Sequence, residues 1–261
     1  MFSLVVPCHN SHIKYVDNTI NFFLKEYLKI VKLTNNRIHL IHQIIIIFCN
    51  VHSRSWENRM KNVIKKIKYT IENNYDLKNI NFIYKSYSIP LNPGMARQKA
   101  YDVIKSKHVV FHDADDEPHP FKLSIMRYMF KNTNADHIHH PFQPIDLPFL
   151  FTNYDENINF KDIQYKIVDK NEIPMKGDKI KSLSTPDVGP VGHGLISIKT
   201  EALFKINWID LRKGEDRQFI SQSLNNNNKI IIIKLPLSKY DKYPVYKMKK
   251  YYPEIFKLYP N

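Results

Sequence analysis

The chain has 261 residues, a formal net charge of +14, 43% hydrophobic residues and 13% aromatic residues. This composition excludes a disordered chain, and the length suffices for one large domain or two small ones with a sizeable core. The two cysteines, Cys8 and Cys49, exclude a disulfide framework or a cysteine metal cage, and we expect free thiols in a reducing compartment.

Targeting signals and membrane spans are not evident in the sequence. The longest apolar run, Ile44–Phe48, is far shorter than the roughly 20 residues of a membrane-spanning helix. The first residues carry no basic segment or cleavage site of a signal peptide. We therefore expect a cytoplasmic protein, in a host cytoplasm if the chain is viral, without a signal peptide or transmembrane anchor.

The first 120 residues alternate between strand and helix patterns. The predicted strands are Phe2–Val6, Ile38–Phe48, Asn81–Tyr87 and His108–His112. The predicted helices between them are Lys14–Leu33, Ser55–Asn73 with Ser55 as its cap, and Ala96–Ile104. A β-α-β-α-β-α-β order predicts an α/β fold with a mostly parallel central sheet flanked by helices.

The pattern becomes less regular after residue 120. The predicted helices there are Phe121–Phe130, Thr200–Ile206 and Glu215–Leu224, and the predicted strands are His137–Pro148, Gly194–Ile198 and Lys229–Leu235. Between these elements, Phe149–Lys181 lacks clear periodicity and suggests short strands and a loop. The tail from Ser238 onward is basic and rich in tyrosine.

An acidic turn follows the fourth predicted strand, in the stretch VVFHDADDEPHP at Val109–Pro120. Asp113 and Asp115 point the same way along an extended chain because side chains alternate. Clustered carboxylates repel one another unless a hard cation such as Mg²⁺ or Mn²⁺ neutralises them. Ligands of open α/β proteins bind at this end of the strands, so the turn is a candidate metal and ligand site.

Three other segments carry polar groups that suit the same site. After the first predicted strand, the turn in VVPCHN exposes backbone groups that can hydrogen-bond a flat base. In the second, Asn92–Arg97, a turn opens a helix whose amides and Arg97 can face an anion such as a diphosphate. In the third, Gly214 precedes Glu215 and Asp216 at another helix start, where one carboxylate can act as a general base.

Together these motifs resemble the GT-A glycosyltransferases, most closely glycosyltransferase family 2. In order, VVPCHN, NPGMARQKA, VVFHDADDEPHP, GHGLISIKTEALFKI and KGEDRQF match that family's pattern over about residues 2–224. The resemblance implies one GT-A domain. Residues 1–120 would form its nucleotide-sugar half, residues 121–235 its acceptor and catalytic-base half, and residues 236–261 a basic tail.

The resemblance also implies roles for individual residues. The residues that would contact the nucleotide are Pro7, His9, Asn10, Arg97, Asp113 and Asp115. Of these, Asp113 and Asp115 would hold Mn²⁺ or Mg²⁺. Asp216 would be the catalytic base of an inverting transfer, and Glu215 would bind acceptor hydroxyls. The implied donor is a nucleotide sugar, with a UDP-sugar expected, and the implied acceptor is a hydroxyl of a glycan, lipid or protein.

This sequence departs from the family pattern at the second strand. The family places an acidic pair there that recognises the base, whereas Asn50 occupies this stretch and could replace it as a hydrogen-bonding group. His193, after a Pro-Gly loop, is a candidate for acceptor or diphosphate binding. His137 and His139 share one face of an extended segment and His140 opposes them, which does not favour a zinc site.

Two other classes of function remain open from the residues alone. The net charge of +14 suggests a nucleic-acid-binding protein, although only the tail Lys239–Tyr259 combines clustered basic and aromatic residues. A metal-dependent phosphohydrolase could use Asp113, Asp115 and Asp116. That enzyme would not need Glu215 and Asp216 or the Asn92–Arg97 turn.

Overall fold

The first half of the chain forms the parallel part of a central sheet. The computed structural model describes residues 1–144, 146–147, 149, 160–173, 175–176, 179–185, 188–211 and 213–240. The first four strands are β1 (Phe2–His9), β2 (Ile41–Cys49), β3 (Asn81–Ser86) and β4 (His108–Phe111). They lie in the order β3-β2-β1-β4, and every neighbouring pair is parallel. The predicted β-α-β alternation is confirmed.

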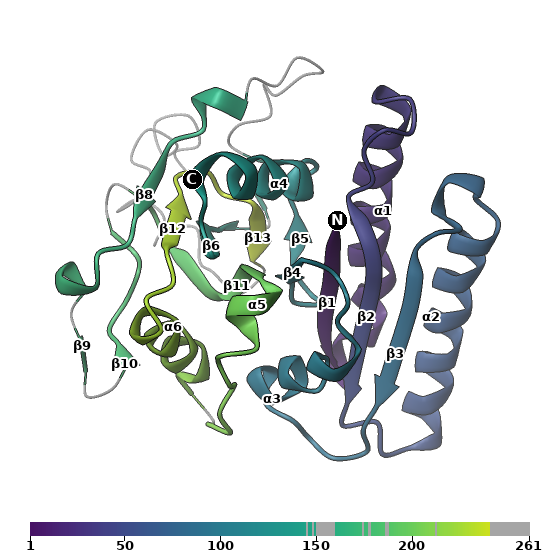
Figure 1. Ribbon diagram of the computed structural model, residues 1–261. Helices are drawn as coiled ribbons and strands as arrows, with labels where there is room; N and C mark the ends of the chain where they lie inside the picture. Colours follow the sequence, from purple (N-terminus) through teal and green to yellow (C-terminus); the bar gives the residue numbers. More distant parts are fainter. Residues whose placement is uncertain are drawn as a thin grey trace.

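The second half extends this sheet with strands of mixed direction (Figure 1). These strands are β6 (His137–Pro141), β8 (Tyr165–Ile167), β11 (Val191–Lys199) and β12 (Ile230–Ile233). The full order is β3-β2-β1-β4-β11-β6-β12-β8. β11 is antiparallel to both β4 and β6, β12 is parallel to β6, and β8 is antiparallel to β12. The predicted mostly parallel α/β sheet is therefore confirmed.

Helices cover both faces of the sheet. The helices are α1 (Ile13–Leu33), α2 (Arg54–Glu72), α3 (Pro93–Gln98), α4 (Lys122–Thr133), α5 (Thr200–Leu203) and α6 (Glu215–Asn225). One buried cluster packs α1, α2 and α4 on one face, and a second packs α3, α5 and α6 on the other. Short 3₁₀ turns occur at Asn10–His12, Tyr75–Leu77, Tyr101–Val103, Phe160–Asp162 and Lys170–Glu172.

Two small sheets lie beside the central one. The first consists of β5 (Glu117–Pro118), β13 (Ser238–Tyr240) and β7 (Gln143–Pro144), with β13 in the middle. The second pairs β9 (Met175–Lys176) with β10 (Lys179–Ile180). The first small sheet joins the segment after the acidic turn to the start of the basic tail. The rest of that tail, residues 241–261, lies outside the described residues.

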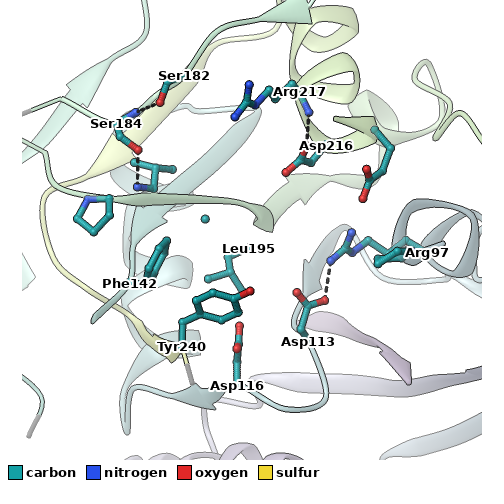
Figure 2. Close-up of a pocket in the computed structure, with 15 residues that line it drawn as sticks. Arg97, Asp113, Asp116, Phe142, Ser182, Ser184, Leu195, Asp216, Arg217 and Tyr240 are labelled. Carbon is teal, nitrogen blue, oxygen red and sulfur yellow. Dashed lines mark hydrogen bonds and ion pairs between the residues drawn. The ribbon is translucent and has the colours of Figure 1, made fainter. Parts of the chain in front are cut away.

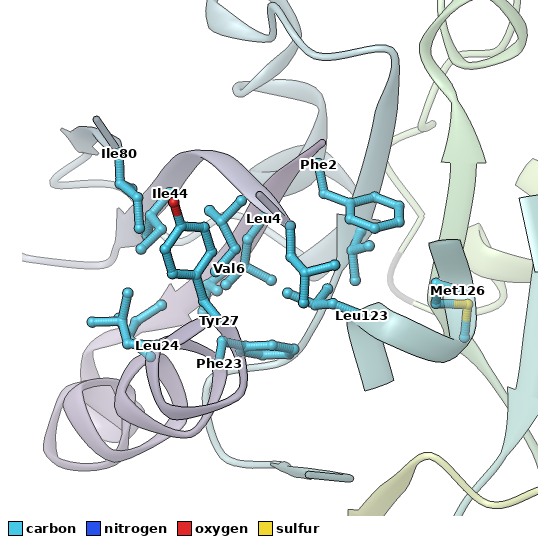
Figure 3. Close-up of a cluster of buried hydrophobic side chains, with 14 of the residues drawn as sticks. Phe2, Leu4, Val6, Phe23, Leu24, Tyr27, Ile44, Ile80, Leu123 and Met126 are labelled. Atoms are coloured by element: carbon cyan, nitrogen blue, oxygen red, sulfur yellow. The ribbon is translucent and has the colours of Figure 1, made fainter. Parts of the chain in front are cut away.

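The larger core forms where α1 and α4 pack on the parallel strands. Alternate residues of β1, including Leu4 and Val6, face Phe23 of α1 and Leu123 of α4 in one continuous apolar cluster (Figure 3). The apolar spacing of α1 explains its position, because residues three and four apart share the face that turns toward the sheet. This packing fixes the carboxyl ends of β1 and β4, where the polar turns follow.

Several predicted boundaries are wrong, each for a local reason. Ser53, not Ser55, caps α2, because its Oγ accepts a hydrogen bond from Trp56 N at 3.4 Å. β1 continues through Pro7 to His9. Proline has no amide hydrogen to donate to a neighbouring strand, and this is tolerated at Pro7 because β4 pairs with β1 only as far as Val5. β11 likewise begins at Val191, before the predicted Gly194.

The helix predicted at Ala96–Ile104 is also wrong. Asn92 caps a helix that starts at Pro93, with its Oδ1 accepting from Met95 N at 2.8 Å. Proline suits a first helical position because its fixed φ matches the helix. The amide hydrogen that proline lacks would have no partner within the helix at that position. The helix ends at Gln98, so Arg97 lies in its last turn and not in its first. No helix among the described residues is long and apolar enough to cross a membrane.

Candidate active site

The acidic turn lies at the carboxyl end of β4, as predicted. Its backbone closes on itself, with Asp116 N donating to Asp113 O at 3.3 Å. Thr19 of α1 holds the turn from behind, because its Oγ1 donates to Ala114 O at 2.8 Å. The helix and the strand that form the core thus also fix the carboxylates.

A smaller pocket of about 200 Å³ lies on one side of this turn. Both Asp113 and Asp115 line it, although the chain forms a turn here and is not extended as expected from the sequence. Its other lining residues are Pro7, His9, His12, Cys49, Leu91, Pro93, Ala96 and Tyr240. The ends of β1 and β2 therefore meet the acidic turn and the start of α3 around one cavity.

Polar side chains form a hydrogen-bonded row along the rim of the smaller pocket. Asn50, in a left-handed backbone conformation at φ 61°, places its Nδ2 3.0 Å from His9 Nε2. His52 Nδ1 lies 3.1 Å from Asn50 Oδ1, and His9 Nδ1 lies 2.9 Å from Ser11 Oγ. Asn50 thus reaches the pocket through His9. Asn10 is buried at 6% exposure, in the turn that follows β1.

A larger pocket of about 450 Å³ lies on the other side of the turn (Figure 2). Asp113 and Asp116 line it from the turn, Arg97 from α3, and Glu215 and Asp216 from the start of α6. The remaining lining residues are Pro93, Phe142, Ser182, Ser184, Pro190, Val191, Gly192, Leu195, Arg217 and Tyr240. Asp113, Pro93 and Tyr240 line both pockets.

Arg97 connects the two sides of the site from within the protein. Its side chain is 1% exposed, and its Nη2 donates to Asp113 Oδ1 at 2.6 Å. The guanidinium also lies 5.0 Å from the ring of Trp208, which stacks on Phe219 of α6 at 4.1 Å. The charge-assisted pair and the cation–π contact hold this cation in one orientation against the acidic turn.

Asp116 is the most deeply buried carboxylate of the turn, at 3% exposure. Burial, followed by the nearby charges of Asp113 and Asp115, raises the pKa of Asp116 well above its ordinary value. Its Oδ1 is buried without a hydrogen-bond partner. A cation bound next to this carboxylate cluster would stabilise its ionised form, which burial and like charges otherwise disfavour.

Glu215 and Asp216 begin α6 beside the start of α3. Gly94 permits this approach, because a Cβ added there would lie 2.8 Å from Glu215 Cγ and 2.9 Å from Trp208 Cε3. Burial, followed by the charge of Asp216, raises the pKa of Glu215. Asp216 Oδ1 accepts from Arg217 N at 2.8 Å, which orients the carboxylate at the helix terminus. Both predicted acidic residues therefore line the larger pocket with Asp113.

Sequence reasoning missed several residues in and around the site. Tyr240 and Phe142 both line the larger pocket, and their rings form a T-shaped contact with centroids 5.3 Å apart. His12 Nδ1 lies 3.3 Å from Asp115 Oδ1, from a turn that reads as an ordinary strand–helix joint. Trp208 was not identified because the residues around it show no helix or strand pattern.

His193, which was predicted to bind the acceptor or the diphosphate, lies within β11, but its side chain is outside what the structure describes.

The carboxylates present fit a divalent cation of the Mg²⁺ or Mn²⁺ type. Among the described residues, no group of three or more His, Cys, Asp or Glu side chains converges as a metal cage. Mg²⁺ does not require one, because it commonly binds through one or two carboxylates together with substrate phosphates. Asp113 and Asp115 on the smaller pocket supply that number, and the unpartnered Oδ1 of Asp116 lies behind them.

Comparisons with known proteins place this arrangement in a fold. No protein-family model matches the sequence, and no curated protein matches it. Solved structures do match its three-dimensional form. Residues 1–349 of S. aureus TarS in complex with UDP match with a TM-score of 0.62 at 16% identity, over 98% of this chain and 65% of that one. The chain has the GT-A fold.

Two further GT-A matches carry ligands. TarS 1–349 in complex with UDP-GlcNAc matches with a TM-score of 0.57 at 14% identity, over 93% of this chain and 59% of that one. The mannosyltransferase PcManGT from Pyrobaculum calidifontis, in complex with GDP-Man and Mn²⁺, matches with a TM-score of 0.52 at 11% identity, over 89% and 55%. This chain therefore spans less than two thirds of each. The GT-A fold expected from the motifs is confirmed.

Proposed function

We propose that this chain is a glycosyltransferase that moves a sugar from a nucleoside-diphosphate sugar, with a UDP-sugar as the expected donor, to a hydroxyl acceptor. One observation carries the proposal. Asp113, in the acidic turn, lines a pocket with Pro7 and His9 on one side and a pocket with Glu215 and Asp216 on the other. The complexes of TarS with UDP-GlcNAc and of PcManGT with GDP-Man support a nucleotide-sugar donor.

The smaller pocket takes the nucleotide in this proposal. Pro7 and His9 contact the base and ribose, with Asn10 in the adjoining turn, and Asn50 acts through its contact with His9. Arg97 holds the Asp113 carboxylate in place near the diphosphate. Apart from Tyr240, every residue that lines this pocket falls within residues 1–120, which we assign as the donor half.

Asp113 and Asp115 would hold Mn²⁺ or Mg²⁺ together with the donor phosphates. When bound, the cation would supply positive charge that stabilises the leaving nucleoside diphosphate. The cluster around Asp116 favours such a cation, because burial and the nearby charges of Asp113 and Asp115 oppose the ionised form of the Asp116 carboxyl group.

The larger pocket takes the transferred sugar and the acceptor. Asp216 removes the proton from the acceptor hydroxyl, and that oxygen attacks the anomeric carbon. The bond from the anomeric carbon to the diphosphate oxygen breaks, and the nucleoside diphosphate leaves with the electron pair. Attack from the face opposite the leaving group inverts the anomeric configuration.

Glu215 and His193 contact the acceptor in this proposal. Most of the wall that faces Asp216 comes from residues 142–217, which falls within the acceptor half that we assign to residues 121–235. The transferred group is a hexosyl or N-acetylhexosaminyl residue, and the acceptor is a hydroxyl of a glycan, lipid or protein. A phosphohydrolase would need the acidic turn but not the carboxylates at the start of α6.

The proposal is tested by incubating the purified chain with individual UDP- and GDP-sugars, with Mn²⁺, with Mg²⁺ or with EDTA. Release of the nucleoside diphosphate from one donor, dependent on the cation and increased by hydroxyl acceptors, is expected. Proton NMR of the product should show an inverted anomeric centre. Cleavage of the donors to nucleoside monophosphate and sugar 1-phosphate, with no sugar transferred to any acceptor or to water, would contradict the proposal.

A further inference from the structure

A fully buried lysine lies beneath the acidic turn. Lys122 is the first residue of α4 and is 0% exposed. Its Nζ lies 3.0 Å from His112 Nδ1 and 3.1 Å from Ser238 Oγ. His112 Nε2 in turn lies 3.2 Å from the backbone oxygen of Asp116. The three side chains form one buried row, which we call the Lys122 relay.

The directions of these hydrogen bonds are fixed by the chemistry of the groups. A carbonyl oxygen only accepts, so His112 Nε2 carries the proton that it donates to Asp116 O. A neutral imidazole then accepts at Nδ1, which is the atom that faces the Lys122 donor. Burial lowers the pKa of His112, in agreement with a neutral ring. Ser238 Oγ donates to Leu237 O at 2.8 Å and accepts from Lys122.

Stability does not explain a lysine at this position. Burial lowers the pKa of Lys122 to about 7, while Asp116, Asp113 and Glu26 oppose that shift. Taking an ammonium out of water is costly, and apolar residues of similar volume often replace buried charged groups without loss of stability. The lysine is nevertheless fully enclosed, next to the apolar residues that α4 contributes to the core.

The relay joins two parts of the site that are far apart in sequence. One end reaches Asp116 in the acidic turn, which lines the larger pocket. The other end reaches Ser238 in β13, the strand that carries Tyr240. Tyr240 lines both pockets, and β13 pairs with β5 and β7 in a sheet separate from the central one. Lys122 of α4 thus links both segments through side chains, in addition to the backbone pairing of β13 with β5 after the acidic turn.

We propose that Lys122 is a positioning residue that holds the acidic turn and the Tyr240 strand in fixed relation to each other. It does so through His112 on one side and Ser238 on the other, without touching the substrate. The inference rests on the proposed function for its effect on catalysis. Its structural part, the link between residues 113–116 and residues 238–240, can be measured independently.

The test compares two variants of the same helix. Lys122→Met removes the relay and keeps the side-chain length, whereas Ser124→Ala removes a buried hydrogen bond to Glu26 that is outside the relay. Thermal unfolding, steady-state kinetics and backbone hydrogen exchange are measured for both. Lys122→Met should keep or raise the Tm and lower kcat/KM for the donor about tenfold or more, the size seen for residues that orient metal-binding groups. Ser124→Ala should lower the Tm and leave the kinetic constants unchanged.

Hydrogen exchange separates the inference from the proposed function. Lys122→Met should accelerate exchange at residues 113–116 and 238–240 and leave α2 unchanged. A folded Lys122→Met protein with wild-type kinetics and exchange would overturn the inference. If the wild-type chain transfers no sugar but the variant accelerates exchange at those two segments, the proposed function falls and the positioning link stands.

Ser238→Ala covers the case in which Lys122→Met does not fold. This change removes one acceptor and leaves the Lys122–His112 contact in place. Faster backbone hydrogen exchange at residues 238–240 and a higher KM for the donor are expected. Wild-type values for both would overturn the inference.

Discussion

Arg97 donates to the Asp113 carboxylate at 2.6 Å from a position where only 1% of its side chain is exposed, while Asp113 is 34% exposed. The buried cation thus presents an acidic residue to both pockets. Trp208 lies under the guanidinium at 5.0 Å and so restricts its orientation. The contact between α3 and the acidic turn is therefore a fixed part of the site.

Replacing Arg97 should damage both stability and function. Arg97→Met leaves Asp113 without its partner, and we expect a loss of about 1–3 kcal/mol in the free energy of unfolding. Transfer should fall as well, because Asp113 loses its orientation. Arg97→Lys should not restore activity, because an ammonium lacks the planar donors and the stacking surface. Urea unfolding and donor kinetics measure the two effects.

Lys85→Met is the matched control for Arg97. Lys85, whose side chain is 24% exposed, pairs with Asp102, whose side chain is 70% exposed, and neither residue lines either pocket. An exposed pair contributes about 0–1 kcal/mol, so this variant should retain stability and activity. Equal losses in the two variants would contradict the special role of the Arg97–Asp113 pair.

A methyl group at Gly94 should disturb the contact between α3 and α6. The added Cβ would lie 2.9 Å from the Trp208 ring, which cannot move freely because it stacks on Phe219. Overpacking of this kind costs about 1–3 kcal/mol. Gly94→Ala should therefore lower the Tm and reduce kcat, since the start of α6 shifts. An unchanged kcat would show that the position of Glu215 is not critical.

Glu26 should make stability depend on pH. Its carboxylate is fully buried and accepts from Leu123 N, Ser124 N and Ser124 Oγ, and burial raises its pKa to about 7. Between pH 4.5 and about 7 the folded protein keeps a proton that the unfolded chain releases. The free energy of unfolding therefore falls as the pH rises through this window, by up to about 3 kcal/mol from this group.

Chemical unfolding at pH 5 and pH 8 measures this dependence. Glu26→Gln cannot titrate, so the variant should lose much of the difference between the two pH values. Glu57→Gln serves as a control because its exposed carboxylate has a pKa lowered by Lys61 and stays ionised over this range. The assignment is wrong if Glu26→Gln retains the full wild-type difference.

Tyr240 should influence both substrates because it lines both pockets. Tyr240→Ala removes the ring that faces Phe142, and we expect a higher KM for the donor and for the acceptor. Tyr240→Phe keeps the ring and should keep most of the activity if the contact is apolar. A change in only one of the two KM values would show that Tyr240 contacts only that substrate and would contradict the prediction.

The motifs near predicted strand ends were placed well from sequence. Pro7, Asp113 and Asp216 each follow or begin a patterned element, so periodicity locates them at one edge of the sheet. The GT-A fold followed from the order of such motifs. Asp113 and Asp216 line the same pocket because the sheet brings β4 and α6 together.

The residues that sequence reasoning missed lack such a pattern. Tyr240 belongs to a three-residue strand, and Trp208 to a connection without secondary structure. Their positions depend on contacts with residues far away in the sequence, and the spacing of hydrophobic residues along the chain does not reveal such contacts. The end of α3 was misplaced for a similar reason, since Gln98 Oε1 accepts from Trp208 N at 2.8 Å, 110 positions away.

The central claim, that Asp115 serves the donor while Asp216 serves the chemical step, is tested by one comparison. Donor binding with Mn²⁺ is measured by calorimetry, and transfer by product formation, for Asp115→Asn and Asp216→Asn. We predict that Asp115→Asn weakens donor binding and abolishes transfer. Asp216→Asn should bind the donor nearly as the wild type does and lose about 10²–10⁴-fold in kcat. Full transfer activity in both variants would contradict the account.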